Sequence, residues 1–196
     1  MKARRTIAWT TVLSITLIVI PVIVQWSPRL LWNASASVPV GLYRLHLVEQ
    51  VTVGDLVAVR PPPALSDYLD ARGYLPRGVP LLKHVMALEG ALVCRSGDRV
   101  TVDHRLLGEA HGQDRVGRAL PIWQGCHRLG ADEVFLVNPD APDSLDGRYF
   151  GPLPLTTITA RLTPLWIVDD VITAEPAHPE PTLHRNRKEA RHAPDR

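Results

Sequence analysis

The sequence contains only two cysteines, Cys94 and Cys126, and no further cysteine or histidine lies at metal-ligand spacing from either. The eight histidines form no His-Glu-x-x-His pair. The chain also lacks a Gly-x-Ser-x-Gly elbow and a phosphate-binding glycine loop. These absences argue against a metal centre, an elbow-type hydrolase and a nucleotide-binding enzyme, and we expect no cofactor.

The sequence also lacks a large excess of positive or negative charge. The net charge is +2 at pH 7, and the pI of 8.7 reflects basic clusters at the two ends of the chain. A basic face is the usual signature of nucleic-acid binding, so we expect no nucleic-acid partner. With 196 residues, of which 45% are hydrophobic, the chain can form one domain of about 130–150 residues and a tether.

One long apolar run is present near the N-terminus. Residues 7–26 carry no charge and follow three basic residues, Lys2, Arg4 and Arg5. A helix of about twenty residues covers the hydrocarbon core of a membrane, and basic residues stay on the cytoplasmic side. We therefore expect residues 1–27 to be a single-pass anchor in the inner membrane, with the remainder in the periplasm. A cleaved signal peptide is the alternative, although the run is longer than the usual apolar region of a signal peptide.

The segments after this run are short and resemble strands. We expect strands over residues 41–48, 51–59, 81–88, 91–94, 99–102, 133–137 and 157–162, and a helix over residues 64–72. The second of these strands should be interrupted by a turn or bulge at Gly54 and Asp55. Gly, Pro and Asp separate these segments, which predicts a mainly antiparallel β domain over residues 28–172. The polar residues 103–128 should form an excursion from the sheet. Residues 173–196 have few large apolar side chains and are expected to be a disordered tail.

The two cysteines fall on the expected periplasmic side. In that oxidising compartment Cys94 and Cys126 could form a disulfide. Two buried free thiols are the alternative, because the sequence does not show whether the two Cα atoms come within bridging distance.

Two separate segments offer groups for nucleophilic chemistry. Ser35 and Ser37 lie in a loop marked by Pro39 and Gly41, shortly after the apolar run. In a strand over residues 81–88, Lys83 would share a face with apolar side chains, and burial would lower its pKa towards that of a neutral base. A lysine that extends to solvent from a strand end is the alternative.

A third segment, residues 144–151, contains an acidic and a basic residue two positions apart. In an extended conformation Asp146 and Arg148 would lie on one side and could form a charge-assisted pair. A structural turn with a surface salt bridge is the alternative.

Four segments, taken in order, resemble the bacterial type I signal peptidases, and in particular the conjugative-transfer branch, the TraF-type pilin-maturation peptidases. These segments are residues 33–43, 53–57, 82–90 and 144–152. The resemblance implies a signal-peptidase-like β fold with Ser37 as nucleophile and Lys83 as general base. It implies that Ser35 contributes to the oxyanion hole, that Ser144 orients the lysine, and that Asp146 and Arg148 brace this region.

The chain departs from the housekeeping branch at three positions. Val38 stands where a methionine usually follows the nucleophile, residues 137–143 replace a Gly-Asp-Asn motif, and Gly147 replaces a serine. The last change leaves the bracing of Asp146 open.

Three functions are compatible with these observations. The first is a membrane-anchored serine endopeptidase that processes a membrane-inserted pilin precursor, with possible cyclisation of the product. The second is a general type I signal peptidase. The third is a non-catalytic periplasmic scaffold of a transfer apparatus, which predicts that replacing Ser37 or Lys83 leaves function intact.

Overall fold

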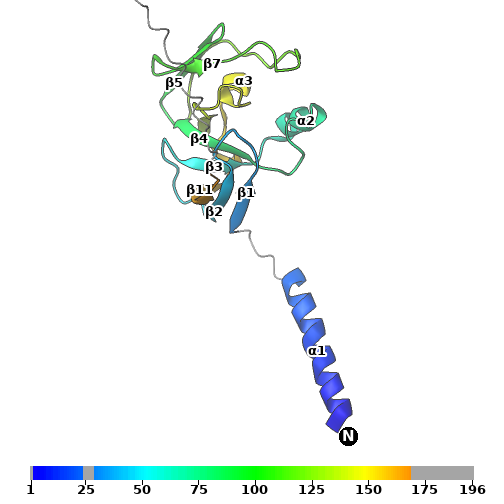
Figure 1. Ribbon diagram of the computed structural model, residues 1–196. Coiled ribbons are helices and arrows are strands. Elements are labelled where there is room, and N and C mark those ends of the chain that lie inside the picture. Colours follow the sequence, from blue (N-terminus) through cyan, green and yellow to red (C-terminus); the bar gives the residue numbers. More distant parts are fainter. Residues whose placement is uncertain (1, 24–28, 169–196) are drawn as a thin grey trace, which may run out of the picture.

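The computed structural model describes residues 2–23 and 29–168 (Figure 1). The tail expected over residues 173–196 lies outside the described residues. The described chain is mainly β, as the turn-separated strand pattern predicts, and its paired strands run antiparallel to one another.

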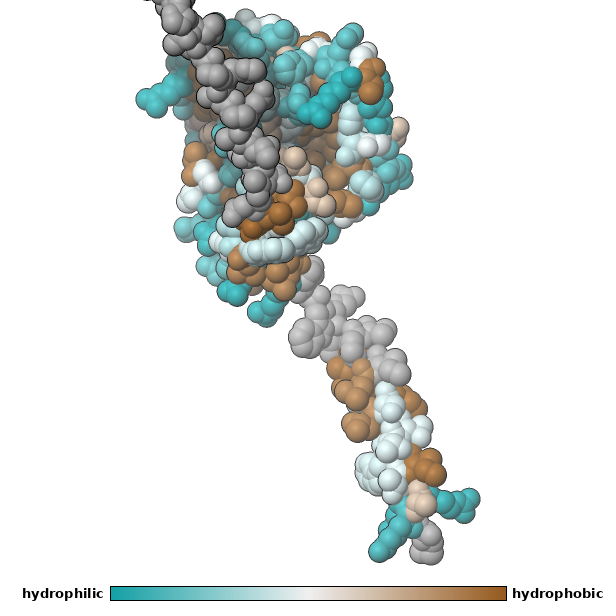
Figure 2. All heavy atoms as spheres, viewed as in Figure 1, coloured by the Kyte–Doolittle hydropathy of each residue, from teal (hydrophilic) through white to brown (hydrophobic). Residues whose placement is uncertain are grey.

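The first element, α1 (Lys2–Ile23), has exposed apolar side chains, among them Trp9 and Leu17. Figure 2 shows hydrophobic residues along this helix and hydrophilic residues at its N-terminal end. Within the described ranges, no helix combines the length and apolar character needed to cross a membrane. The membrane-spanning anchor expected in residues 1–27 is therefore not confirmed.

A seven-stranded sheet forms the larger part of the β structure, in the order β1-β2-β11-β3-β4-β9-β10. Its strands are β1 (Leu30–Asn33), β2 (Gly41–His46), β3 (Leu56–Val59), β4 (Leu81–Ala87), β9 (Glu133–Val137), β10 (Leu153–Pro154) and β11 (Ile158–Ile167). A 3-10 turn, Leu155–Thr157, precedes β11. Because β4 lies between β3 and β9, residues at its centre are shielded on both sides.

A smaller sheet of four strands, in the order β7-β6-β5-β8, lies at the other end of the domain (Figure 1). Its strands are β5 (Leu92–Ser96), β6 (Arg99–Val102), β7 (Arg105–Glu109) and β8 (Gly125–Arg128). Cys94 of β5 is paired in register with Cys126 of β8, and a disulfide joins them. The excursion expected over residues 103–128 therefore begins and ends in strands of this sheet.

Alternation along the central strands divides the core between the two faces of the large sheet. Val57 and Val85 pack with Leu69 of α2 (Pro63–Ala71), whereas Ala58 and Leu82 face a second cluster that contains Tyr43. Lys83 follows Leu82 and therefore points towards the side that α2 covers.

Within the segment expected over residues 51–59, the strand is β3, and the interruption expected at Gly54 and Asp55 is a turn in which Asp55 accepts a hydrogen bond from the Thr52 backbone N–H at 2.9 Å. Another expectation from the sequence is wrong in detail. The extended segment expected around Asp146 and Arg148 is instead a helical turn, α3 (Gly147–Phe150). Asp146 is the N-cap of this turn and accepts from the backbone N–H of Arg148.

Candidate active site

The loop that carries Ser37 connects β1 to β2, and its two ends are paired directly because Asn33 lies opposite Gly41. Gly41 cannot be replaced without movement, since a Cβ there would lie 2.2 Å from the backbone oxygen of Trp166. Val38 is buried and anchors the loop beside Ser37, which is half-buried. The loop thus presents Ser37 at a fixed point on the surface of the large sheet.

Lys83 lies at the centre of β4 with only 3% of its surface exposed. Its Nζ donates a hydrogen bond to Ser144 Oγ at 2.6 Å. Burial lowers the pKa of Lys83 to about 8; the charge of Asp146 opposes this shift and that of Arg148 adds to it. A lysine in this state can exchange a proton near neutral pH, as a general base must.

Asp146 and Arg148 form a buried ion pair rather than a surface salt bridge. The Arg148 Nε donates to Asp146 Oδ1 at 2.9 Å, and its Nη2 donates to Asp146 Oδ2 at 2.9 Å, so the pair is bidentate. Nη2 also donates to the backbone oxygens of Ala141 and Ser144. The pair therefore holds the backbone of the loop from which Ser144 reaches the Lys83 amine.

Three further polar residues support this site and were not singled out as site residues from the sequence. The buried Asn138 donates to the backbone oxygen of Leu82 at 2.9 Å and accepts from the backbone N–H of His84 at 3.2 Å, which holds both neighbours of Lys83. Asparagine within a run of turn residues gives no sequence signal for this role. The other two are Arg95 and Asn33.

Arg95 is a buried arginine of β5, with 1% of its surface exposed. Its Nη1 donates to the backbone oxygen of Arg148 at 2.7 Å, and its Nε donates to that of Gly97 at 3.0 Å. Burial lowers the pKa of Arg95 below the usual value. Through this contact the small sheet supports the turn α3.

Ser37 and Lys83 line the same cavity, whose volume is about 610 Å³. Ser35 and Ser144 line it as well, and apolar residues from β4 and α2, including Leu81 and Leu69, complete its walls. The structure therefore brings the predicted nucleophile, the predicted base and two of their predicted supports to one cavity. Asp146 and Arg148 lie behind it, buried beneath Ser144.

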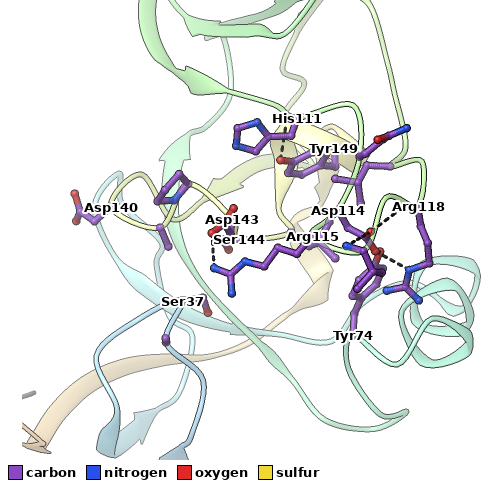
Figure 3. A pocket seen from close by; sticks show the side chains of 17 residues that line it. Ser37, Tyr74, His111, Asp114, Arg115, Arg118, Asp140, Asp143, Ser144 and Tyr149 are labelled. Carbon is purple, nitrogen blue, oxygen red and sulfur yellow. Dashed lines mark hydrogen bonds and ion pairs between the residues drawn. The ribbon is translucent and has the colours of Figure 1, made fainter.

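A second cavity, of about 540 Å³, also includes Ser37 and Ser144 (Figure 3). Its other wall comes from the excursion between β7 and β8, where Arg115 extends to an ion pair with Asp143. Asp114 accepts hydrogen bonds from Tyr74 and Arg118 in the same wall. Ser37 thus borders two cavities: one that contains Lys83 and has mainly apolar walls, and one whose other wall carries charged side chains.

The sequence is similar to known proteins over most of its length. The family model described as signal peptidase, peptidase S26, matches residues 3–166. The plasmid transfer protein TraF of Escherichia coli is 33% identical over 143 residues, which cover 68% of this chain and 80% of that protein. The probable conjugal transfer protein TraF of Sinorhizobium fredii is 36% identical over 155 residues, covering 74% and 77%. A signal peptidase I from Enterococcus faecalis superposes with a TM-score of 0.35 and 16% identity, over 59% of this chain and 99% of that one.

Proposed function

This chain belongs to the signal peptidase S26 family and is similar to conjugal transfer proteins, and from that premise we propose that it is a serine endopeptidase with Ser37 as nucleophile and Lys83 as general base. The observation that carries the proposal is the buried Lys83 amine, with its lowered pKa, in the cavity that Ser37 also lines. Neutral Lys83 would accept the Ser37 proton as the Ser37 oxygen attacks the scissile carbonyl.

The remaining residues of the site have supporting roles in this proposal. Ser144 holds the lysine amine in place, and the Asp146–Arg148 pair holds Ser144. The Ser35 hydroxyl and the Ser37 backbone N–H stabilise the oxyanion that forms on the carbonyl oxygen. Lys83 then returns its proton to the leaving amine, which leaves an acyl ester on Ser37.

The proposed substrate is a membrane-inserted pilin precursor used in conjugation. The support is the similarity to proteins described as plasmid or conjugal transfer proteins. The acyl ester can be resolved by water or by the substrate's own amino group. In the second case the new amide bond closes a ring, the ester bond to Ser37 breaks, and the Ser37 oxygen regains its proton.

The proposed place of action is the periplasmic face of the inner membrane. The Cys94–Cys126 disulfide supports an oxidising compartment. The uncharged residues 7–26, after three basic residues, support association with the membrane. Fractionation of cells that express the full chain, with protease access from the periplasm, tests this location.

The deciding experiment is co-expression with a pilin-like precursor, read out by the intact mass of the product. Ser37→Ala and Lys83→Ala should both abolish processing while the protein remains present. Ser96→Ala is a matched control, because Ser96 is exposed on β5 and lines neither cavity beside Ser37. A product lighter by one further water reports cyclisation. Unchanged processing in both site variants would favour the scaffold hypothesis.

A further inference from the structure

The side chain of Asn33 makes all of its hydrogen bonds within the loop that carries Ser37. It is 5% exposed and lies at the end of β1. Its Nδ2 lies 2.8, 3.0 and 3.1 Å from the backbone oxygens of Ser35, Val38 and Pro39. Its Oδ1 accepts from the Ser35 backbone N–H at 3.0 Å and from the Ser35 hydroxyl at 2.8 Å.

These partners determine which end of the amide is oxygen. Three backbone oxygens surround one end, and a backbone N–H, which can only donate, faces the other. The opposite orientation would place an amine against a donor and an oxygen against three acceptors. The Ser35 hydroxyl therefore donates its single proton to Asn33 Oδ1.

This donation has a consequence for the neighbouring nucleophile. Ser35 Oγ lies 3.3 Å from Ser37 Oγ, and Ser35 has no second proton to give. In that contact Ser37 must be the donor and Ser35 the acceptor. In the resting site, then, neither hydroxyl proton is in its catalytic position: that of Ser37 points to Ser35, and that of Ser35 points to Asn33.

We propose that Asn33 is a positioning residue. In the resting enzyme its Oδ1 accepts the hydrogen bond from the Ser35 hydroxyl, and during the reaction this hydroxyl turns to donate its hydrogen bond to the oxyanion instead. The proposal rests on the serine peptidase function proposed above. As Ser37 gives its proton to Lys83, Ser35 Oγ no longer accepts a hydrogen bond from Ser37. The Ser35 hydroxyl can then rotate about its Cβ–Oγ bond. It then exchanges a neutral amide acceptor for an anionic one.

The exchange favours the transition state over the ground state. A hydrogen bond to an ionised acceptor is roughly twice as strong as one between neutral groups. The hydrogen bond donated by the Ser35 hydroxyl therefore becomes stronger only when charge appears on the substrate oxygen. An interaction that strengthens in the transition state raises kcat. Meanwhile the Nδ2 contacts with the loop hold Ser35 in place while its hydroxyl turns.

A double-mutant cycle between Asn33 and Ser35 tests the proposal. Ser35→Ala should lower kcat by about 10²–10³ with little change in KM, the usual cost of one oxyanion donor. Asn33→Ala should also lower kcat, and the factor lost should be several-fold smaller in the Ser35→Ala background than in the wild type. Equal factors in the two backgrounds would overturn the proposal, because they would show that Asn33 acts independently of the Ser35 hydroxyl.

Two controls separate this result from misfolding and from failure of the proposed function. Ser35→Thr retains a hydroxyl and should retain the full dependence on Asn33. The pH midpoint of activity, which Lys83 governs, should be the same in Asn33→Ala and wild type. If the wild type neither cleaves a precursor nor is phosphonylated at Ser37 by a serine-directed phosphonate, the peptidase proposal itself fails. If the wild type is active, the double-mutant cycle alone tests the role of Asn33.

A second measurement needs no substitution. In a crystal structure of the full chain with a peptide boronate, the tetrahedral boronate oxygen stands in for the oxyanion. The Ser35 hydroxyl should leave Asn33 Oδ1 and lie within hydrogen-bond distance of that oxygen, while the Asn33 Nδ2 contacts persist. A Ser35 hydroxyl that still donates to Asn33 in this complex would overturn the proposal.

Discussion

At the scale of single residues, the burial of Lys83 suits the role proposed for it, which requires a neutral amine. A lysine in water is charged at pH 7 and cannot accept a proton. Here burial lowers its pKa to about 8, and the Ser144 hydroxyl oxygen is its hydrogen-bond acceptor. Desolvation disfavours the protonated form of the Lys83 amine, and for the same reason it favours the neutral form that can act as a base.

The pH dependence of activity follows from this pKa. Cleavage of a peptide substrate should rise with pH, with a midpoint in kcat/KM near the Lys83 pKa of about 8, because only the neutral amine accepts the Ser37 proton. Lys83→Arg should be inactive, since a guanidinium stays protonated throughout this range. A flat profile below pH 9, or an active arginine variant, would contradict the assignment of Lys83 as base.

Gly147 has a steric reason to be glycine in this chain. A Cβ there would lie 2.9 Å from the backbone oxygen of Leu136 and 2.8 Å from the ring of Phe135. The α3 turn thus packs directly on β9, and the serine found at this position in the housekeeping branch would not fit without movement. The bracing of Asp146, left open by the sequence, depends on this close packing.

Replacing Gly147 should therefore be costly. Gly147→Ala is expected to lower the free energy of unfolding by about 1–3 kcal/mol, as overpacking of a core usually does, and to lower activity by displacing Asp146. Gly112→Ala is the matched control, because a Cβ at Gly112 meets nothing within 4 Å. Urea denaturation and peptide cleavage of the two variants would measure the difference. Equal stability in both would show that α3 tolerates a side chain.

At the scale of elements, hydrogen bonds link the small sheet to the α3 turn, and the shorter of them comes from a buried arginine of the small sheet. Arg95 of β5 donates to the backbone oxygen of Arg148, while its Nη2 has no hydrogen-bond partner among the described residues. A buried cation with an unused donor is costly to the fold. The contact gives the small sheet a means of holding α3 in position.

The effect of Arg95 should appear in catalysis as well as in stability. Arg95→Met removes the donor to Arg148 but fills similar space, so we expect a folded protein with reduced kcat and little change in KM. The expected measurement is kcat on a peptide substrate at a temperature where circular dichroism shows the variant folded. A folded variant with wild-type kcat would limit Arg95 to the core of the small sheet.

The disulfide acts at the same scale, since it joins β5 to β8 across 32 residues of sequence. In the chain-entropy model, closing a loop of this length stabilises a protein by about 3–4 kcal/mol. The double variant Cys94→Ser and Cys126→Ser should lose stability of this order in urea denaturation. Adding a reductant should lower the stability of the wild type and leave that of the double variant unchanged. Activity should persist while the variant is folded, because neither cysteine lines a cavity beside Ser37.

At the scale of the whole molecule, the buried Lys83 amine is expected to lower the stability of the fold. Its pKa is about 8 in the folded chain and 10.5 as a free side chain. Between these values the unfolded chain binds more protons than the folded one, so stability should rise with pH from about 8 to 10.5. Below pH 8 the full penalty, about 3 kcal/mol at 1.36 kcal/mol per pKa unit, is present.

Removing the amine should therefore stabilise the protein while abolishing activity. Lys83→Met is expected to raise the melting temperature at pH 7, and the gain over wild type should shrink towards pH 10. Part of the gain is offset by the Ser144 hydroxyl, which loses its donor. Calorimetry at the two pH values measures the difference, and a gain that is independent of pH would show that titration of Lys83 is not its source.

The local features of this protein can be predicted from its sequence. Alternating residues predict that β4 is a strand and place Lys83 on the face of Leu81 and Val85, and the loop with Ser35 and Ser37 can be read from its turn residues. The order of four short motifs was enough to indicate the family. These features depend on residues that are close together in the chain, and the sequence gives their order and spacing directly.

The contacts between residues far apart in the chain become visible only in the folded structure. It shows that Ser144 lies 2.6 Å from the lysine 61 positions before it, that Asp146 and Arg148 are buried rather than solvated, and that Cys94 faces Cys126. It replaces an extended segment with the α3 turn, because Asp146 caps that turn. Burial and desolvation arise when strands far apart in the chain pack together, and they are what turn an ordinary lysine into a candidate base.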